Sequence, residues 1–443
     1  MRYLGLIFGK LVFIILKVLG RNGGSFPGQV ALWFCSDIIK YFKYPKTVVL
    51  ITGTNGKTST SNLIYQSLKK SGKNVDSNNR GDNIIYGISS LLIKNSNLFF
   101  NVKREALVIE IDELTLAKYL KYIVATDIVI TNFFRDQLDR AGEMETVISK
   151  IEKALSSYNN NLFINENDPN VKRLYKASCN AKVIGFSIDK MNLSKSENFD
   201  AKEGKFCPFC LNELCYEYYH YSHIGKFICN NCDFASKKGL FELIDIDYDS
   251  KVISIKTIDN VVKLGYGIDD IYHLYNLLSA ASVCLNLGVD YKFIDETFKT
   301  FKLGIGRMES INIKGKELLL NLVKNPTGFN EIIKSINKSK NEKVMMFILN
   351  DNEQDGTDTS WIWDIDLHYI ENLSKIILSG KRAYEAAIRF KLEDMGVEIV
   401  VEKNKDKAID LILNSQYEPY VIATYTALFE IRKKLIDKSK LES

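Results

Sequence analysis

Short apolar runs that alternate with longer helical segments organise most of the chain. Between residues 47 and 305, the runs expected to form strands are Val48–Ile51, Ala106–Ile111, Asp127–Thr131, Leu162–Asn165 and Lys182–Phe186. After residue 306 they are Val344–Leu349, Lys375–Leu378, Val397–Val401 and Tyr420–Ala423. Strands that alternate with helices are typical of a mostly parallel sheet with helices on both faces. The pattern therefore predicts an α/β protein with two sheet-containing domains, at residues 47–305 and 306–443.

The first 46 residues follow a different pattern and predict a helical arm. Leu4–Leu19 is strongly apolar but is interrupted by Lys10 and Lys17. Because a span of the hydrocarbon core needs about 20 mostly apolar residues, this segment is too short and too charged to cross a membrane. It lacks the small-residue cleavage site of a signal peptide. Two interpretations stay open: a basic amphipathic helix on an anionic leaflet, or a helix packed on the next domain.

Composition adds little except in the arm. The 443 residues are 46 % hydrophobic with a net charge of +5, which is too mild to indicate a nucleic-acid surface. Residues 1–46, however, hold seven basic side chains against one acidic side chain, Asp37. The length predicts about three domains. We expect a cytoplasmic protein, in peripheral contact with the inner face of the membrane if the arm lies on lipid.

A glycine turn follows the first predicted strand and opens into a helix. Backbone N–H groups around Gly53 and Gly56, with the helix dipole, form a cradle for phosphate oxygens. Lys57 can reach the β- and γ-phosphates, and the Thr58 hydroxyl can bind Mg²⁺. The stretch predicts an ATP site made by Gly53, Thr54, Asn55, Gly56, Lys57, Thr58 and Ser59.

Cysteine spacing predicts a structural metal site. Two C-x₂-C pairs, Cys207/Cys210 and Cys229/Cys232, are separated by eighteen residues, which is the spacing of a four-cysteine zinc ribbon. Four thiolates close a tetrahedron around Zn²⁺ and leave no open position, so the site is expected to stabilise the fold without catalysing. Cys215, His220 and His223 lie between the pairs and are weaker candidates. The ribbon is expected as an insertion at about residues 199–243.

The loop and several later segments resemble the Mur ligases. The G-T-N-G-K-T loop is the variant found in Mur ligases and folylpolyglutamate synthases, and the order and spacing of the other segments match over about two-thirds of the chain. Those segments are Glu110–Glu113, Thr131–Arg140 (with Gln137 at a family histidine position), Asn165–Pro169, the helix of Asn276, and Gly306–Glu309. The resemblance implies that Glu110 binds Mg²⁺ with Thr58, although Asp112 or Glu113 can take that role. It also places Asn276 and Arg307 on the nucleotide.

An acidic, tryptophan-containing stretch after Leu349 separates this chain from ordinary Mur ligases. The stretch contains Asp351, Asp355, Asp358, Asp364, Trp361 and Trp363. A Ca²⁺ loop is excluded because its twelfth position is Ile362, where a bidentate glutamate is required. The D-Y-A-H-x-P element of the ligases is replaced by Asn321–Pro326.

This combination is similar to the MurT family, the Mur-ligase-like synthetase subunits of lipid II isoglutaminyl synthase. The resemblance implies a central Mur-ligase-like P-loop domain with an inserted zinc ribbon, and a Rossmann-like C-terminal domain. It implies a GatD-type class I glutaminase partner that supplies ammonia, and amidation of the D-glutamate α-carboxylate in lipid II. It further implies that Asp358 completes the partner's Cys–His pair as the third member of a triad.

The chemistry of the residues agrees with this interpretation. A carboxylate accepts ammonia only after activation, and transfer of the γ-phosphoryl group gives an acyl phosphate with a good leaving group. Charge neutralisation at that phosphoryl group is expected from Lys57, Arg307 and Mg²⁺ on Thr58 and Glu110. The four histidines form no evident Cys–His pair for glutamine hydrolysis. A glutaminase is therefore expected on another chain.

Two other functions compete with this interpretation. A free-standing Mur- or folylpolyglutamate-type amino-acid ligase would use the same ATP chemistry with an amino acid as the nucleophile, but the altered element at Asn321–Pro326 and the acidic stretch argue against it. A zinc-ribbon nucleic-acid protein with an ATPase motor would bind RNA or DNA in a salt-dependent way. The ribbon shows no concentration of arginine, and no nucleic-acid partner is expected.

Overall fold

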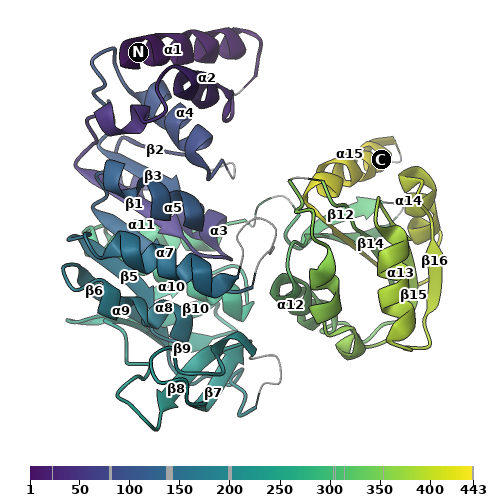
Figure 1. The fold of residues 1–443 in the computed structure, drawn as a ribbon. Coiled ribbons are helices and arrows are strands. Elements are labelled where there is room, and N and C mark those ends of the chain that lie inside the picture. The colour runs from purple at the N-terminus through teal and green to yellow at the C-terminus, as the bar shows by residue number, and fades with distance from the viewer. Residues whose placement is uncertain are drawn as a thin grey trace. The chain divides into compact units, whose positions relative to one another are not determined.

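The computed structural model describes residues 1–441 except 22, 79–81, 136–142, 198–201, 303, 305, 314 and 353. Contacts divide the chain into two compact units, each with its own sheet (Figure 1). The first unit holds residues 1–134 and 144–302, and the second holds residues 135–143 and 303–443.

A nine-stranded sheet forms the centre of the first unit, in the order β11-β10-β9-β6-β5-β4-β1-β3-β2. Strands β9, β6, β5, β4, β1, β3 and β2 are parallel to one another. Strand β10 is antiparallel to β9, and β11 is antiparallel to β10. All five apolar runs predicted as strands are strands of this sheet. The bounds are β1 Thr47–Thr52, β2 Val75–Ser77, β3 Ala106–Glu110, β4 Asp127–Ile130, β5 Asn161–Asn165, β6 Lys182–Ile188, β9 Phe241–Asp247, β10 Val252–Lys256 and β11 Val261–Gly265.

Helices cover this sheet, and α3, α10 and α11 pack against one another as well as against strands. Strands β1, β3 and β4 are buried along almost their whole length, as expected for parallel strands covered on both faces. The helices are α3 Lys57–Lys70, α4 Ile85–Asn95, α5 Glu113–Tyr119, α7 Met144–Leu155, α8 Pro169–Lys172, α9 Leu174–Ala177, α10 Ile271–Asn286 and α11 Tyr291–Thr300.

The N-terminal arm consists of α1 (Arg2–Val18), α2 (Phe26–Phe34) and a 3₁₀ turn at Ile38–Tyr41. Helix α1 packs on α2 and α4, and it does so through glycines. A Cβ at Gly5 would lie 2.8 Å from the Ala31 carbonyl oxygen, and one at Gly9 would lie 2.9 Å from Ile93 Cδ1. The arm is therefore packed on the first unit. None of the helices searched among the described residues is long and apolar enough to cross a membrane.

A hairpin of β7 (Leu214–Tyr221) and β8 (Ile224–Cys229) carries the cysteine pairs. It lies in sequence between β6 and β9, which pair directly with each other in the main sheet. The hairpin is therefore an insertion between two adjacent strands, and a 3₁₀ turn at Lys202–Gly204 precedes it.

The second unit is a six-stranded sheet in the order β12-β13-β17-β14-β15-β16, in which all neighbours except β12 and β13 are parallel. Two buried clusters lie on opposite faces of it, one with α12 and α13 and the other with α14 and α15. The four predicted strands are confirmed. The bounds are β12 Glu309–Ile313, β13 Lys316–Leu322, β14 Lys343–Ile348, β15 Leu373–Ser379, β16 Glu398–Val401, β17 Glu418–Ala423, α12 Pro326–Ile336, α13 Ala383–Leu392, α14 Lys405–Leu413 and α15 Tyr425–Leu441, with 3₁₀ turns at Ser360–Asp364 and Leu367–Tyr369.

Candidate active site and metal centre

The loop between β1 and α3 has the backbone conformation of a phosphate cradle. Gly53 and Gly56 have φ values of +122° and +86°, which side-chain-bearing residues rarely adopt. A Cβ on Gly53 would lie 2.3 Å from Thr131 Oγ1, and one on Gly56 would lie 2.0 Å from Asn276 Oδ1. Helix α3 begins at Lys57, so its unpaired N–H groups face the loop. The structure thus brings Asn276, on α10, to the loop as predicted for a nucleotide-site residue.

The segment after β4 fixes the shape of this loop. Asn132 accepts from the loop twice, through its backbone oxygen from Thr54 N at 2.9 Å and through Oδ1 from Asn55 N at 2.9 Å. Thr131 Oγ1 donates to the Asn55 carbonyl at 2.8 Å. Neither Thr131 nor Asn132 was predicted as a site residue, although their Thr-Asn pair at the end of a strand was a usable sequence indication. The segment that resembles the family at Asp136–Arg140, including Gln137, lies outside the described residues.

Lys57 is buried among carboxylates. Its Nζ lies 2.9 Å from Glu113 Oε1, and it also donates to the carbonyl oxygens of Gly53 and, at 3.3 Å, Thr54. Burial lowers the pKa of Lys57, but Glu113, Glu110 and Asp112 more than offset this effect and raise the pKa above its ordinary value. The ammonium is therefore retained at neutral pH and held at the mouth of the cradle. An incoming phosphate anion can take over the position of Glu113 as its counter-ion.

Among the three neighbouring carboxylates, Glu110 fits a divalent cation best. It ends β3 and is 2 % exposed; its Oε1 accepts from Asn83 Nδ2 at 3.2 Å, and its Oε2 has no hydrogen-bond partner among the described residues. Asp112 instead caps α5 by accepting from Leu114 and Thr115 backbone N–H groups, and Glu113 is paired with Lys57. A buried carboxylate oxygen without a partner is costly unless a ligand binds it. This distinction could not be made from sequence.

Arg307 lies at the start of the second unit, where its backbone N–H donates to Gly304 O at 3.2 Å. The cradle lies in the first unit, so contact between Arg307 and the nucleotide stays a prediction.

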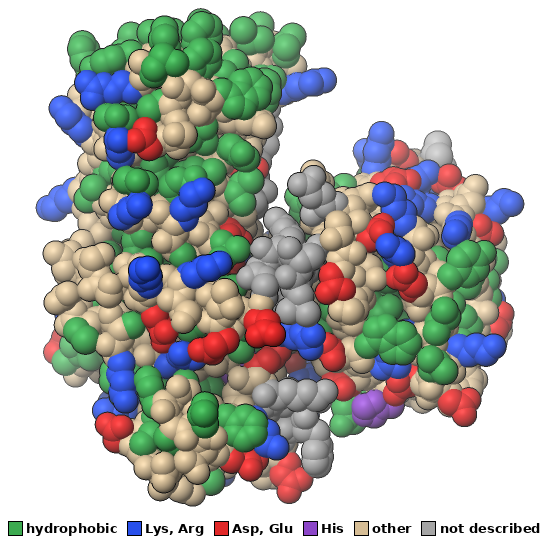
Figure 2. Space-filling model, in the orientation of Figure 1, with side chains coloured by type: hydrophobic (Ala, Val, Ile, Leu, Met, Phe, Trp, Pro, Cys, Tyr) green, Lys and Arg blue, Asp and Glu red, His purple; other side chains and the backbone are tan. Residues whose placement is uncertain are grey.

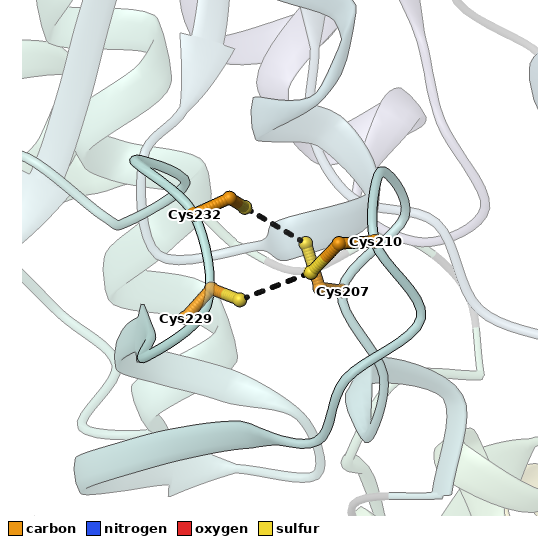
Figure 3. Close-up of side chains that lie close together, drawn as sticks. All are labelled: Cys207, Cys210, Cys229 and Cys232. Carbon is orange, nitrogen blue, oxygen red and sulfur yellow. Dashed lines mark hydrogen bonds between the residues drawn. The ribbon is translucent and has the colours of Figure 1, made fainter.

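Four thiols converge at one end of the inserted hairpin (Figure 3). Cys207 Sγ lies 3.6 Å from Cys232 Sγ, Cys210 Sγ lies 3.4 Å from Cys229 Sγ, and the four sulfur atoms lie within 4.8 Å of one another. Sulfur atoms around a tetrahedral Zn²⁺ at about 2.3 Å are expected at about this separation. The donor set is closed and can hold a metal ion without an open position.

The weaker ligand candidates have other partners. Cys215 accepts from Asn230 Nδ2 at 3.1 Å. His220 bonds the Tyr275 hydroxyl at 2.6 Å through Nδ1 and the Asp189 carbonyl at 3.2 Å through Nε2, and burial lowers its pKa to about 4. His223 lies between two carboxylates. These contacts leave the four cysteines as the candidate metal ligands.

His223 connects the hairpin, through Asp168, to the segment after β4 that contacts the nucleotide loop. It is fully buried, with Nε2 3.3 Å from Asp168 Oδ1 and Nδ1 3.3 Å from Glu203 Oε2. Asp168 caps α8 and accepts from Phe133 N at 2.9 Å, and the Phe134 N–H donates to Thr54 Oγ1 at 3.0 Å. Burial lowers the pKa of His223, but Asp168 and Glu203 raise it further, to about 9. No local sequence pattern indicated this long-range pairing.

The charge on His223 predicts a pH dependence of stability. Its folded-state pKa of about 9 lies above the unfolded value of about 6.5, so the stabilisation is complete below about pH 6.5 and is lost as the pH rises through 9. The shift corresponds to roughly 3 kcal/mol. Denaturant unfolding of wild type and His223→Gln between pH 6 and 10 measures this difference. A gap between the two proteins that does not shrink towards pH 10 contradicts the assignment.

The aspartates of the acidic stretch in the second unit differ in environment: some are held by other residues of the unit, and others are accessible. Asp355 is 4 % exposed and accepts from Thr426 N at 2.6 Å and Asn352 Nδ2 at 3.1 Å, while Asp351 pairs with Arg382 at 2.7 Å and Asp364 with Arg135 at 2.9 Å. Asp358 is partly exposed and accepts from Ser360 N at 2.8 Å and Ser360 Oγ at 2.9 Å. Asp358 is therefore an accessible carboxylate, and its action on a partner chain stays a prediction.

The two tryptophans of this stretch have different environments. Trp361 is buried in the cluster with α12 and α13, where its ring lies 6.5 Å from that of Phe347. Trp363 is 52 % exposed, with the Arg389 guanidinium 5.8 Å from its ring centre. Trp361 therefore anchors the stretch, and Trp363 lies at the surface.

Comparisons with known proteins agree with these observations. A model of the Mur ligase middle domain matches residues 51–236, and a model of the MurT ligase C-terminal region matches residues 322–428. The "lipid II isoglutaminyl synthase (glutamine-hydrolyzing) subunit MurT" of Staphylococcus aureus strain COL is 34 % identical over 429 residues, which cover 96 % of each chain. The chain belongs to the MurT family. The subunit of the same name from Streptococcus pneumoniae is 33 % identical, over 98 % of this chain and 97 % of that one.

Solved structures support the fold assignment. A pseudomurein peptide ligase type C from Methanothermus fervidus has a TM-score of 0.70 at 22 % identity, covering 91 % of this chain and 80 % of that one. MurF from Acinetobacter baumannii has a TM-score of 0.64 at 14 % identity, covering 93 % and 80 %. The predicted Mur-ligase-like α/β fold is confirmed.

Proposed function

We propose that this chain is the synthetase subunit of a lipid II isoglutaminyl synthase. It amidates the α-carboxylate of the D-glutamate in the lipid II stem peptide to D-isoglutamine, with ATP as the activating substrate and ammonia from a GatD-type glutaminase. The observation that carries the proposal is near full-length similarity to subunits with that name. We place the reaction in the cytoplasm, at the inner face of the membrane that holds lipid II.

The chemistry has two steps. A carboxylate oxygen of the substrate attacks the γ-phosphorus, and the bond between that phosphorus and the β–γ bridging oxygen breaks. ADP departs, and the substrate is left as an acyl phosphate. Ammonia then attacks the acyl carbon, loses a proton, and expels inorganic phosphate to give the amide. The first step needs charge neutralisation at the phosphoryl group, and the buried ammonium of Lys57 provides it at the mouth of the cradle.

The residues of the cradle fit ATP and Mg²⁺, which Mur-ligase kinship implies. Gly53, Gly56 and the first turn of α3 form the phosphate site, and Asn276 borders it. Thr58 and Glu110, whose Oε2 has no hydrogen-bond partner among the described residues, are the proposed ligands of Mg²⁺, which when bound neutralises charge on the phosphates. Arg307 is proposed to contact the nucleotide from the second unit.

The nucleophile decides between this function and that of an amino-acid ligase. With ATP, lipid II and ammonium, and without partner or amino acid, the chain is expected to form the amide and ADP in equal amounts, as measured by mass spectrometry and a coupled ADP assay. Product formed only with an amino acid would contradict the proposal.

We propose Zn²⁺ as the metal of the four-cysteine centre, with a structural role. The purified protein is expected to carry about one Zn²⁺ per chain by elemental analysis, and Cys210→Ser is expected to lose the metal and lower the thermal midpoint before it lowers ammonium-driven turnover. Cys215→Ser is the matched control, because Cys215 lies outside the cluster. Metal-free protein prepared without chelators contradicts the site.

A further inference from the structure

The exposed side of α1 carries apolar side chains, where a surface helix in water ordinarily carries polar ones. Leu4, Ile7, Leu11, Ile14, Ile15 and Val18, here called the apolar arc, are between 43 % and 82 % exposed. At 100° per residue these side chains lie on one side of the helix, opposite the buried Gly5 and Gly9. Figure 2 shows the resulting concentration of hydrophobic side chains over α1 and α2. A helix that is apolar all round is ordinarily covered by protein or lipid.

Charge beside the arc indicates what covers it. Residues 1–46 carry seven basic side chains and one acidic side chain, a net +6, whereas the whole chain has a net charge of +5. The remainder is therefore slightly negative, and the excess positive charge belongs to the arm. Asp37, its one acid, pairs with Lys40. Lys17 and Arg21 are exposed and lie at the C-terminal end of α1 and just beyond it, next to Val18 of the arc.

Lys10, by contrast, serves the fold. Its Nζ donates to the Ile93 carbonyl at 2.7 Å and to the Ser96 carbonyl, at the C-terminus of α4, and burial lowers its pKa. Together with the close approach at Gly5 and Gly9, this contact fixes α1 on the first unit. The helix cannot turn its apolar arc inwards without losing this packing.

We propose that the apolar arc of α1 is a docking surface for an anionic lipid bilayer. The arc enters the interface between headgroups and acyl chains, and Lys17 and Arg21 pair with lipid phosphates. The helix lies in the membrane plane rather than spanning it. This inference deepens the proposed function, because a lipid-linked stem peptide is found at such a surface and the docked helix holds the first unit beside it.

Vesicle flotation of the full chain, without ATP or lipid II, tests docking independently of the reaction. Wild type is expected to float with vesicles of 70 % phosphatidylcholine and 30 % phosphatidylglycerol, more weakly with pure phosphatidylcholine, and less at high salt. Ile14→Glu/Val18→Glu is expected to lower binding at least about 10-fold, because two apolar side chains are replaced by charges that resist burial. Lys17→Glu/Arg21→Glu is expected to lower binding about 10-fold or more on the anionic vesicles only.

The matched control is Val124→Glu/Ile258→Glu, which changes two exposed apolar side chains of the same unit outside the arm. It is expected to float like wild type. Wild type that does not float, or an arc variant that floats like wild type, overturns the proposal. The proposal is also overturned if the arcs of two copies of the chain pack on each other in a dimer. Analytical ultracentrifugation would then show a wild-type dimer and a monomeric arc variant. Amidation of detergent-dispersed lipid II by the arc variant at wild-type rate separates a failure of docking from a failure of the proposed function.

Discussion

Asp358→Asn, assayed in complex with the glutaminase partner, is expected to lose glutamine-driven amidation while ammonium-driven amidation stays largely intact. A triad carboxylate fixes the tautomer of its histidine and stabilises the imidazolium, and its replacement by asparagine costs about 10⁴-fold in turnover. Asp358 is partly exposed in a turn held by Ser360 and belongs to the second unit, whereas the cradle residues belong to the first. Its loss should therefore affect ammonia supply and not ATP chemistry.

Neighbouring aspartates provide the controls. Asp355→Asn removes an acceptor that holds the turn to Thr426, so it should lower the stability of the second unit and both activities together. Asp364→Asn breaks only a partly exposed pair with Arg135 and should change either activity little. Equal loss of both activities in a well-folded Asp358→Asn protein would assign Asp358 to substrate or Mg²⁺ instead.

Lys57→Ala is expected to lower the rate of amidation by about 10³-fold or more with either nitrogen source. The ammonium that neutralises the transferring phosphoryl group is lost in this variant, and no neighbouring cation among the described residues of the loop replaces it. Initial rates with glutamine and with ammonium at saturating ATP measure the effect. Activity near the wild-type rate would show that the cradle assignment is wrong.

The buried pair with Glu113 requires a second variant. Lys57→Ala alone leaves Glu113, 13 % exposed, without its counter-ion, and that defect can destabilise the protein. Lys57→Ala/Glu113→Gln removes both charges, and its thermal midpoint is expected to recover towards wild type while its activity does not. Recovery of activity together with stability would mean that Lys57 acts through folding rather than through the phosphate.

Local sequence patterns predicted the parts of this protein that depend on local physics. Val48–Ile51 and Ala106–Ile109 are continuous apolar runs because parallel strands are buried on both faces, and the cysteine pairs have the spacing that a tetrahedral ion demands. Strands β2, β9, β10 and β11 of the same sheet were not predicted. Of these, β2 and β11 are the edge strands and are only partly buried, so neither has to be a continuous apolar run.

Contacts between distant segments could not be predicted in this way. The pairing of His223 with Asp168 and Glu203 joins three segments that no periodicity relates, and a histidine among cysteines indicated a ligand instead. The identity of the carboxylate with an unpaired oxygen depended on Asn83 and on the cap made by Asp112. The arm left two interpretations open because α1 is apolar on both sides: its glycine face packs on protein, and its apolar arc is exposed.

Transfer of oxygen-18 tests the central claim most directly, which is that the chain activates a carboxylate as an acyl phosphate before ammonia attacks. Lipid II labelled with oxygen-18 at both oxygens of the D-glutamate α-carboxylate is incubated with the chain, ATP, Mg²⁺ and ammonium, and the inorganic phosphate is analysed by mass spectrometry. The predicted result is one labelled oxygen in phosphate for each amide formed, with the other retained in the amide. Amide formed alongside unlabelled phosphate would contradict the account.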